Sequence, residues 1–170
     1  VWGTVKDHRG FIDVTSTEGV GTEITLFFPV TRKAFSTQFE ITSIENILGN
    51  GESILVVDDV EEQRQIASKM LEKLGYTVLT VSSGEEAVEF LKEHIVDLIL
   101  LDMIMDPGMS GREAYEKIIE IHPNQKAVIA SGFAETDEVK EAQKLGAGKY
   151  IKKPLTLEKL GLAVKDELKK

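Results

Sequence analysis

Cysteine is absent from this chain of 170 residues, and its absence excludes disulfide bonds, thiolate metal sites and a cysteine nucleophile. Basic residues are outnumbered by acidic ones, and the net charge of −9 argues against a nucleic-acid-binding surface, which needs a basic patch. No apolar run reaches the length of a membrane span, and no signal peptide opens the chain. These absences favour a soluble, cytoplasmic protein that makes no membrane contact through this sequence. The chain begins at Val1 rather than Met, so we expect a piece of a longer protein, in which a membrane anchor is compatible with this composition.

A packed core is expected, because 42% of the residues are hydrophobic. From Ser53 onward, short apolar runs alternate with stretches whose apolar residues recur every three or four positions. This alternation predicts an α/β fold in which a doubly wound, five-stranded parallel sheet carries helices on both faces. The predicted strands are Ser53–Val57, Thr77–Val81, Asp97–Leu101, Lys126–Ala130 and Lys149–Ile151.

Helix boundaries are marked by residues with known positional roles. Ser83 followed by Glu86 predicts a capping box at the start of the second helix. Gly75 and Gly146 stand where glycine commonly closes a helix, here the first and the fourth. Pro123 should end the third helix, because the residue before proline is pushed out of the α region.

Residues 1–30 lack this alternation of strand and helix patterns, which indicates that they are organised separately. Within residues 1–30, Trp2–Arg9 reads as a helix end closed by Gly10. Phe11–Ser16 and Glu23–Phe28 read as two strands around a glycine-containing turn, an N-terminal β-hairpin. A lone hairpin is only marginally stable in water, so this one should need a partner surface. Residues 31–51 show no period and read as a linker, which leaves residues 52–170 as the α/β domain.

Three aspartates stand directly after predicted strands. Asp58 and Asp59 follow the first strand, and Asp102 follows the third. In the flavodoxin-like strand order 2-1-3-4-5 these two strands are neighbours, and ligands bind at the carboxyl edge of such sheets. Three carboxylates at one edge repel one another unless a cation or a shared proton offsets the repulsion. A site for a hard divalent cation such as Mg²⁺ is the simplest physical answer.

The ends of the fourth and fifth predicted strands are followed by two further polar residues, Ser131 and Lys153. With a cation held by two carboxylates, the remaining carboxylate can attack phosphorus and form an aspartyl phosphate. Lys153 would offset the charge that develops on the phosphoryl group, and the Ser131 hydroxyl would hydrogen-bond one of its oxygens.

Each of these residues also has an ordinary structural interpretation. Asp59 before a helix could serve only as an N-cap, and a single aspartate such as Asp102 is usually a turn residue. Lys153 alone is most often a solvated lysine, and Ser131 with its following glycine is a common loop dipeptide. The conjunction of all of them at successive strand ends favours the phosphoryl-transfer interpretation.

Five short motifs stand at or beside the predicted strand ends of residues 52–170. They are Ile54-Leu55-Val56-Val57-Asp58-Asp59, Leu100-Leu101-Asp102, Pro107-Gly108-Met109-Ser110-Gly111, Ala130-Ser131-Gly132 and Tyr150-Ile151-Lys152-Lys153-Pro154. Through these motifs, residues 52–170 resemble a response-regulator receiver domain. The resemblance implies that Asp102 accepts a phosphoryl group from a phosphohistidine, and that Ser131 and Lys153 contact this group. Tyr150 resembles the aromatic switch residue of the family, although a rim aromatic is the plainer interpretation. The implied ligands of Mg²⁺ are Asp58 (mainly through water), Asp59, Asp102 and the backbone carbonyl of Ile104.

One loop departs from the family pattern. The family usually has Asp-x-x-Met-Pro-x-Met-x-Gly after the third strand, whereas this chain carries Asp106 as an additional residue before Pro107. The insertion leaves Asp102 and Ile104 in place, but it lengthens the loop beside the cleft and puts the loop shape and the dephosphorylation rate in doubt. The resemblance also implies a cis peptide bond at Lys153-Pro154.

Residues 1–30 resemble the last part of a histidine-kinase ATPase domain, through Val1-Trp2-Gly3-Thr4-Val5-Lys6, Gly10-Phe11-Ile12, Gly19-Val20-Gly21-Thr22 and Phe27-Phe28-Pro29. The order of segments is that of the C-terminal part of a hybrid sensor histidine kinase. The family's asparagine-bearing helix and glycine-rich ATP contacts are missing, so we expect this chain to act as phosphoacceptor only. The implied partners are a histidine kinase core or a histidine phosphotransfer protein, and a homodimer through the hairpin is a further possibility.

Two other functions remain open. A Mg²⁺-dependent phosphatase or phosphotransferase with an aspartyl intermediate commonly has a second acid two residues after the nucleophile, where this chain has Ile104. A degenerate receiver that acts only as a binding module is disfavoured by the complete set of aspartates, serine and lysine. The histidines of the chain, His8, His94 and His122, lie outside the acidic helical context of a phosphodonor.

Overall fold

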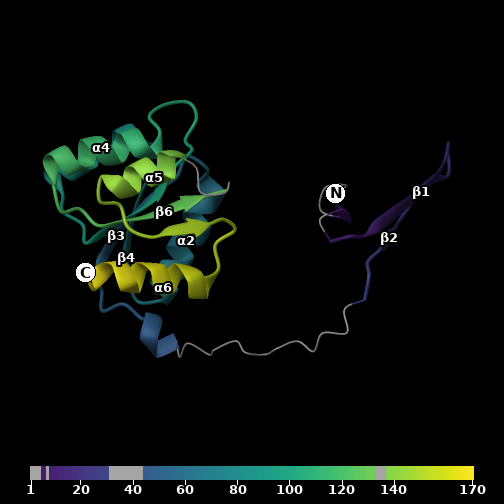
Figure 1. Cartoon of the computed structure of the whole chain (residues 1–170), viewed down its shortest axis with the longest axis horizontal. Helices are drawn as coiled ribbons and strands as arrows, with labels where there is room; N and C mark the ends of the chain where they lie inside the picture. The colour runs from purple at the N-terminus through teal and green to yellow at the C-terminus, as the bar shows by residue number, and fades with distance from the viewer. Residues whose placement is uncertain (1–4, 7, 31–43, 133–136) are drawn as a thin grey trace. The chain divides into compact units, whose positions relative to one another are not determined.

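The computed structural model describes residues 5–6, 8–30, 44–132 and 137–170. The chain divides into two compact units, Val1–Glu40 and Ile41–Lys170, and each unit has its own sheet (Figure 1). Within the described residues, no helix combines the length and the apolar character that a membrane span requires.

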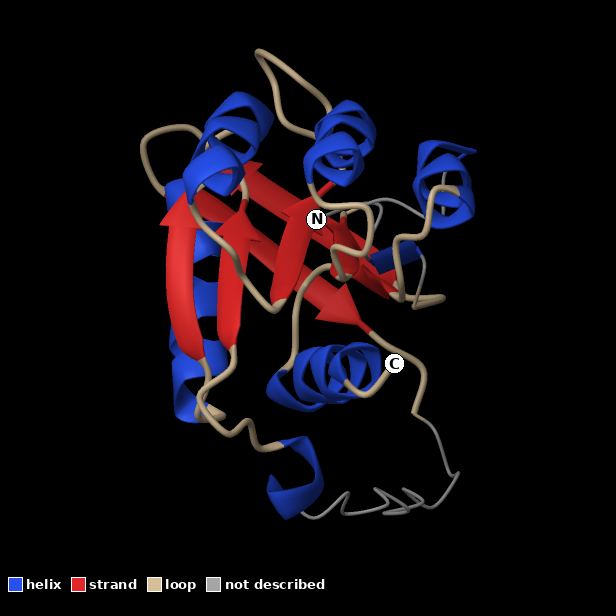
Figure 2. Ribbon diagram, turned by 90° about the vertical axis from the view of Figure 1, so that its left-hand side faces the viewer, coloured by secondary structure: helices blue, strands red, loops and turns tan. Residues whose placement is uncertain are grey.

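The second unit is built on a five-stranded parallel sheet with the order β4-β3-β5-β6-β7, which confirms the predicted order. Helices lie on both faces of this sheet (Figure 2). One face is covered by α2 (Glu61–Lys73) and α6 (Leu157–Leu168), and the other by α3 (Gly84–Glu93), α4 (Gly111–Ile121) and α5 (Asp137–Lys144). The strands are β3 (Ser53–Val57), β4 (Thr77–Val81), β5 (Leu98–Asp102), β6 (Ala127–Ser131) and β7 (Tyr150–Lys152).

The last three strands begin and end one residue later than predicted. Pairing continues through Asp102, which lies opposite Ala130, and through Ser131, which lies opposite Lys152. The N–H of Met103 also donates to Ala130 O at 3.2 Å, so the ladder extends past the apolar run. Asp102 and Ser131 are therefore the final residues of rigid strands rather than the first residues of loops.

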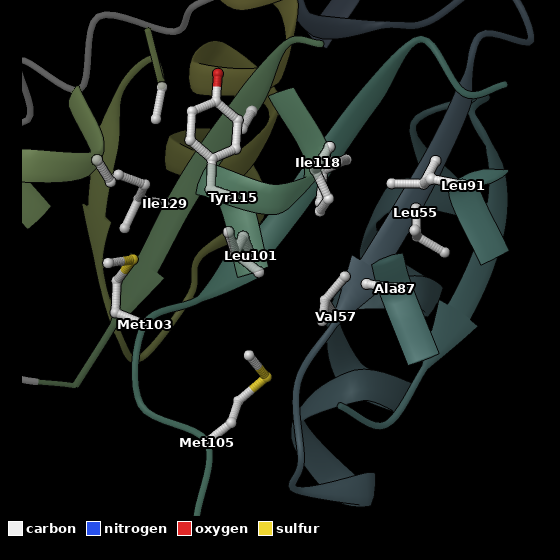
Figure 3. Packing of buried hydrophobic residues seen from close by; sticks show 14 of the residues in the cluster. Leu55, Val57, Ala87, Leu91, Leu101, Met103, Met105, Tyr115, Ile118 and Ile129 are labelled. Atoms are coloured by element: carbon white, nitrogen blue, oxygen red, sulfur yellow. The ribbon is translucent and has the colours of Figure 1, made fainter. Parts of the chain in front are cut away.

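The central strands are apolar throughout because both of their faces are buried. Leu55 and Val57 of β3 point into the core beneath α3 and α4, where they pack with Leu101, Ala87 and other side chains (Figure 3). The alternate residues Ile54 and Val56 face the core beneath α2 and α6. This two-sided burial accounts for the unbroken hydrophobic runs in the sequence.

The predicted helix boundaries are mostly confirmed, with one correction. Ser83 Oγ accepts from the N–H of Glu86 at 3.1 Å, but the Glu86 carboxylate accepts from the N–H of Ser82 rather than of Ser83. The capping box predicted there is thus only half formed, because the serine before the cap takes the carboxylate. Gly75 and Gly146 have φ values of 86° and 113°, as helix-closing glycines do.

The predicted linker contains a segment that packs on α6 and belongs to the second unit. Its residues Ile44–Ile47 form a 3-10 helix, η1, and Ile47 is only 2% exposed. A Cβ on Gly161 of α6 would lie 2.9 Å from Ile47 Cβ, so this close approach needs glycine. The N–H of Gly49 then donates to Leu74 O at 2.7 Å. Residues 31–43 of the predicted linker lie outside the described residues.

The first unit contains the predicted hairpin, β1 (Phe11–Thr17) and β2 (Gly21–Phe27), which pair antiparallel. Ile12 lies opposite Leu26 and Val14 opposite Ile24, so these four aliphatic residues share one face of the hairpin. Most of this face is exposed, since Val14 is 55% and Ile24 58% accessible. The predicted helix end before the hairpin lies largely outside the described residues.

Replacing Ile47 by Ala should lower the free energy of unfolding of the second unit by about 2 kcal/mol, because the substitution leaves a cavity against Gly161 and Leu74. Urea denaturation followed by circular dichroism measures the change. Leu48→Ala is the matched control, since Leu48 is adjacent and 37% exposed. Equal stability of the two variants would show that η1 does not contribute to the fold.

Candidate functional site

The predicted aspartates meet at the carboxyl edge of the sheet. Asp58 follows β3 directly and is 5% exposed, and Asp102 ends β5 and is 7% exposed, whereas Asp59 is open to solvent. One carboxylate oxygen from each of the three lies within 4.8 Å of the others. The parallel pairing of β3 with β5 produces this convergence, because both strands end at the same edge.

Lys153 supplies a positive charge at the centre of this cluster. Its Nζ lies 2.6 Å from Asp58 Oδ2 and 2.7 Å from Asp102 Oδ2, and its side chain is 11% exposed. The backbone N–H of Lys153 donates to Ser131 O at 2.8 Å, which fixes the lysine beside the end of β6. The peptide bond between Lys153 and Pro154 is cis, as expected.

Each carboxylate also accepts one backbone N–H. Asp58 Oδ1 accepts from Val60 at 2.9 Å, and Asp102 Oδ1 accepts from Ile104 at 3.3 Å. Asp59 Oδ2 accepts from the N–H of Asp106, the additional loop residue, at 3.3 Å. The N-cap of α2 is Val60 and has no side-chain cap, so the interpretation of Asp59 as a simple N-cap is not supported.

The electrostatics of the cluster are unfavourable to a charged Asp102. Burial raises the pKa of Asp102 above its usual value, and the neighbouring negative charge of Asp58 adds to this effect. The hydrogen bond and positive charge of Lys153 oppose the rise without cancelling it. A further positive charge at the cluster would therefore be stabilising, and carboxylate oxygens are the ligands that hard divalent cations prefer.

Ser131 and Tyr150 lie on the strands beside the cluster. Ser131 ends β6 and is 1% exposed. Tyr150 begins β7, is half-buried and packs against the core beneath α3, α4 and α5. Residues 133–136, between β6 and α5, lie outside the described residues.

Two residues that sequence reasoning did not assign shape the loop beside the cluster. Gly111 begins α4, and a Cβ there would lie 2.2 Å from Asp102 O, so the chain can return this closely only at glycine. Glu85, in the first turn of α3, accepts the N–H of Met109 at 2.8 Å. The family motif contains Gly111, but no sequence pattern indicates Glu85, because 24 residues separate it from its partner.

Comparison with known proteins agrees with this geometry. The family model for the response regulator receiver domain matches residues 54–165. The chain is 32% identical over 174 residues to the autoinducer 1 sensor kinase/phosphatase LuxN of Vibrio harveyi, covering 92% of this chain and 20% of that protein. It is 28% identical over 180 residues to the sensor kinase CckA of Brucella abortus, covering 100% of this chain and 19% of CckA. The chain thus spans about a fifth of the length of either kinase.

A solved structure of a receiver domain protein has a fold similar to that of this chain. The response regulator receiver domain protein of Clostridium thermocellum is 32% identical with a TM-score of 0.65, covering 69% of this chain and 94% of that one.

Replacing Asp102 by Asn should raise the free energy of unfolding at pH 7 in buffer without divalent cations. The folded-state pKa of Asp102 lies above its ordinary value of 3.8, so the ionised carboxylate destabilises the fold at neutral pH. That penalty disappears as the pH falls below 3.8, where Asp102 is protonated in both states, and the gain from the substitution should shrink with it.

Urea denaturation at several pH values measures this effect. Asp106→Asn is the matched control, because it removes an exposed carboxylate of the same loop that lies outside the cluster. An Asp102→Asn variant less stable than the wild type at pH 7 would show that the ionised Asp102 carboxylate does not destabilise the fold.

Proposed function

This chain belongs to the response regulator receiver family, and on that basis we propose that Asp102 is the residue on which it accepts a phosphoryl group in two-component signalling. The observation that carries the proposal is the Lys153 ammonium, held between Asp58 and Asp102 at 2.6 and 2.7 Å at the carboxyl edge of the sheet. An isolated structural aspartate has no need of a buried counterion shared with a second carboxylate.

The proposed reaction is an in-line transfer from phosphohistidine. A carboxylate oxygen of Asp102 attacks phosphorus, the phosphorus–nitrogen bond breaks, and the imidazole leaves with the bonding electrons and takes up a proton. Lys153 is already placed beside Asp102, where its charge would offset the negative charge on the transferring oxygens. The chain itself thus contributes a positioned nucleophile, Asp102, and a positioned positive charge, the Lys153 ammonium.

The residues fit a magnesium ion as the cofactor. Asp58, Asp59 and Asp102 offer oxygen ligands within 4.8 Å of one another, and hard cations such as Mg²⁺ bind through one or two carboxylates while keeping several waters. We propose Asp59, Asp102 and the backbone carbonyl of Ile104 as direct ligands, with Asp58 acting mainly through water. When bound, the ion would supply further charge neutralisation at the phosphoryl group.

The proposed signal passes to the surface through the neighbouring strands. Ser131 would hydrogen-bond a phosphoryl oxygen and Tyr150 would turn inward after it, which would change the face formed by α5, β7 and α6. The buried position of Ser131 at the end of β6 and the half-buried position of Tyr150 on β7 support these assignments. The local charge would bias a two-state surface that partner proteins recognise.

The context that we propose is a hybrid sensor histidine kinase, with residues 1–30 as the end of its ATPase domain, residues 31–51 as linker and residues 52–170 as receiver. The alignment with the sensor kinase CckA spans this whole chain, hairpin included, which supports the assignment. The donor would be the kinase core or a histidine phosphotransfer protein. Since such a kinase draws on ATP, we place the domain in the cytoplasm.

Incubation of the wild-type chain with acetyl phosphate and Mg²⁺ should produce a single phosphoryl adduct, because the small donor supplies the group that Asp102 is placed to accept. Intact-mass analysis detects the adduct, and Asp102→Asn should show none. An adduct of equal yield on Asp102→Asn would overturn the assignment of the acceptor, and steady turnover of a phosphate ester would favour a phosphatase instead.

Lys153→Ala should slow adduct formation by about 10²-fold, the usual effect of removing one preorganised donor from a transition state. The rate is measured by the same mass analysis over time. Lys152→Ala is the matched control, because Lys152 is the exposed neighbour on β7, whereas the lysine that pairs with Asp58 and Asp102 among the described residues is Lys153. Equal rates for the two variants would remove Lys153 from the mechanism.

The exposed apolar face of the hairpin should cause the chain to form a homodimer, because this face presents a row of aliphatic side chains beside strand edges that no other described strand pairs with. The row consists of Ile12, Val14, Ile24 and Leu26. Sedimentation velocity measures the dimer, and Ile24→Lys should shift it to monomer. Thr25→Lys, on the opposite face, is the control. A monomeric wild type at high protein concentration would contradict this prediction.

A further inference from the structure

The loop formed by residues 103–110 is held from two sides by carboxylates of other elements. The N–H of Asp106 donates to Asp59 Oδ2 at 3.3 Å, and the N–H of Met109 donates to Glu85 Oε1 at 2.8 Å. Asp59 belongs to the acidic cluster, whereas Glu85 lies in the first turn of α3 and has no part in the function proposed above. The proposed acceptor site therefore does not account for the hydrogen bond between Glu85 and Met109.

Glu85 is available for this contact because its neighbours provide the helix cap. Ser83 Oγ accepts the N–H of Glu86 at 3.1 Å, and the Glu86 carboxylate turns back to the N–H of Ser82 at 2.7 Å. Hydrogen bonds from its own N–H and from the N–H of Met109 lower the pKa of Glu85. The carboxylate is thus an ionised acceptor at neutral pH, and charged acceptors make stronger hydrogen bonds than neutral ones.

Two glycines allow the loop to lie this close to α3. Gly108 has a φ of 135°, and a Cβ there would lie 3.1 Å from Glu85 Oε1. A Cβ on Gly84 would lie 3.2 Å from Met109 Cβ. A Cβ at either position would crowd the contact between the loop and the first turn of α3, so the two glycines allow the loop to lie beside Glu85.

The orientation of the Asp59 carboxylate depends on this loop more than the orientations of Asp58 and Asp102 do. Asp58 and Asp102 are buried and share the ammonium of Lys153. Asp59 is exposed, and among the hydrogen bonds of the described residues the one that it accepts comes from Asp106. The orientation of Asp59 is therefore set by the position of the loop rather than by the core.

We propose that Glu85 is a positioning residue of the acceptor site. By fixing Met109 it holds the loop where the N–H of Asp106 orients the carboxylate of Asp59 for the cation. This inference rests on the proposed function, because it takes Asp59 as a ligand of Mg²⁺. It also gives a role to the additional residue, since Asp106, which the family pattern usually lacks, is the residue that contacts Asp59.

Titration of the full chain with Mg²⁺, followed by amide NMR shifts, tests the proposal. Glu85→Ala should weaken Mg²⁺ binding by roughly 3–10-fold, somewhat less than the usual effect of losing a partner in direct contact with a metal ligand. The amide resonances of Met109 and Asp106 should move before any Mg²⁺ is added. Glu85→Gln retains an acceptor oxygen and should restore the affinity to within about twofold of the wild type.

Glu89→Ala is the matched control, because Glu89 lies on the same helix and pairs with Lys92 rather than with the loop. The proposal is overturned if the wild type binds Mg²⁺ and Glu85→Ala binds it as tightly as Glu89→Ala, with the Asp106 amide unmoved. A wild type that does not bind Mg²⁺ would overturn the cation site itself, which separates that failure from failure of the role given to Glu85. Urea denaturation of both variants shows whether any change in affinity comes from lost stability.

Discussion

The ammonium group of Lys153 lies between two buried carboxylates, 2.6 Å from Asp58 and 2.7 Å from Asp102. Burying two negative charges side by side is costly, and this lysine is the positive charge that the chain itself supplies to offset it. The arrangement needs three strands to end at one edge, since Asp58 follows β3, Asp102 ends β5 and Lys153 follows β7. The parallel sheet and its crossover helices are thus what make the site possible.

Much of this edge could be predicted from the sequence, because β3, β5 and β6 are short apolar runs followed at once by a polar residue, Asp58, Asp102 or Ser131. An apolar run identifies a strand buried on both faces, and the parallel order then places its last residue at the ligand-binding edge. The ends of β5, β6 and β7 were predicted one residue early, because hydrophobicity stops at Leu101 and Ala130 while backbone pairing continues. Asp102 and Ser131 are held more rigidly as a result.

The contacts that sequence reasoning missed are those between residues far apart in the chain. Nothing local to Ile47 indicates that it packs against Gly161, and nothing local to Glu85 indicates that it binds the N–H of Met109. Even the capping box at Ser83 formed only in part, because Ser82 competes for the same carboxylate of Glu86. Periodicity and capping rules describe single elements, whereas these contacts depend on how the elements pack.

The burial and charge of the cluster make its balance sensitive to any charged group that binds there. Burial raises the pKa of Asp102, so the cation-free site holds a carboxylate that is less stable than it would be in water. A cation or a phosphoryl group bound there would change this local balance of charge around the Lys153 ammonium, while the backbone N–H of Lys153 donates to Ser131 O at the end of β6. Lys153 follows β7 directly, and Tyr150 is the first residue of that strand. The strand that carries the proposed switch residue thus leads straight into the counterion of the two buried carboxylates.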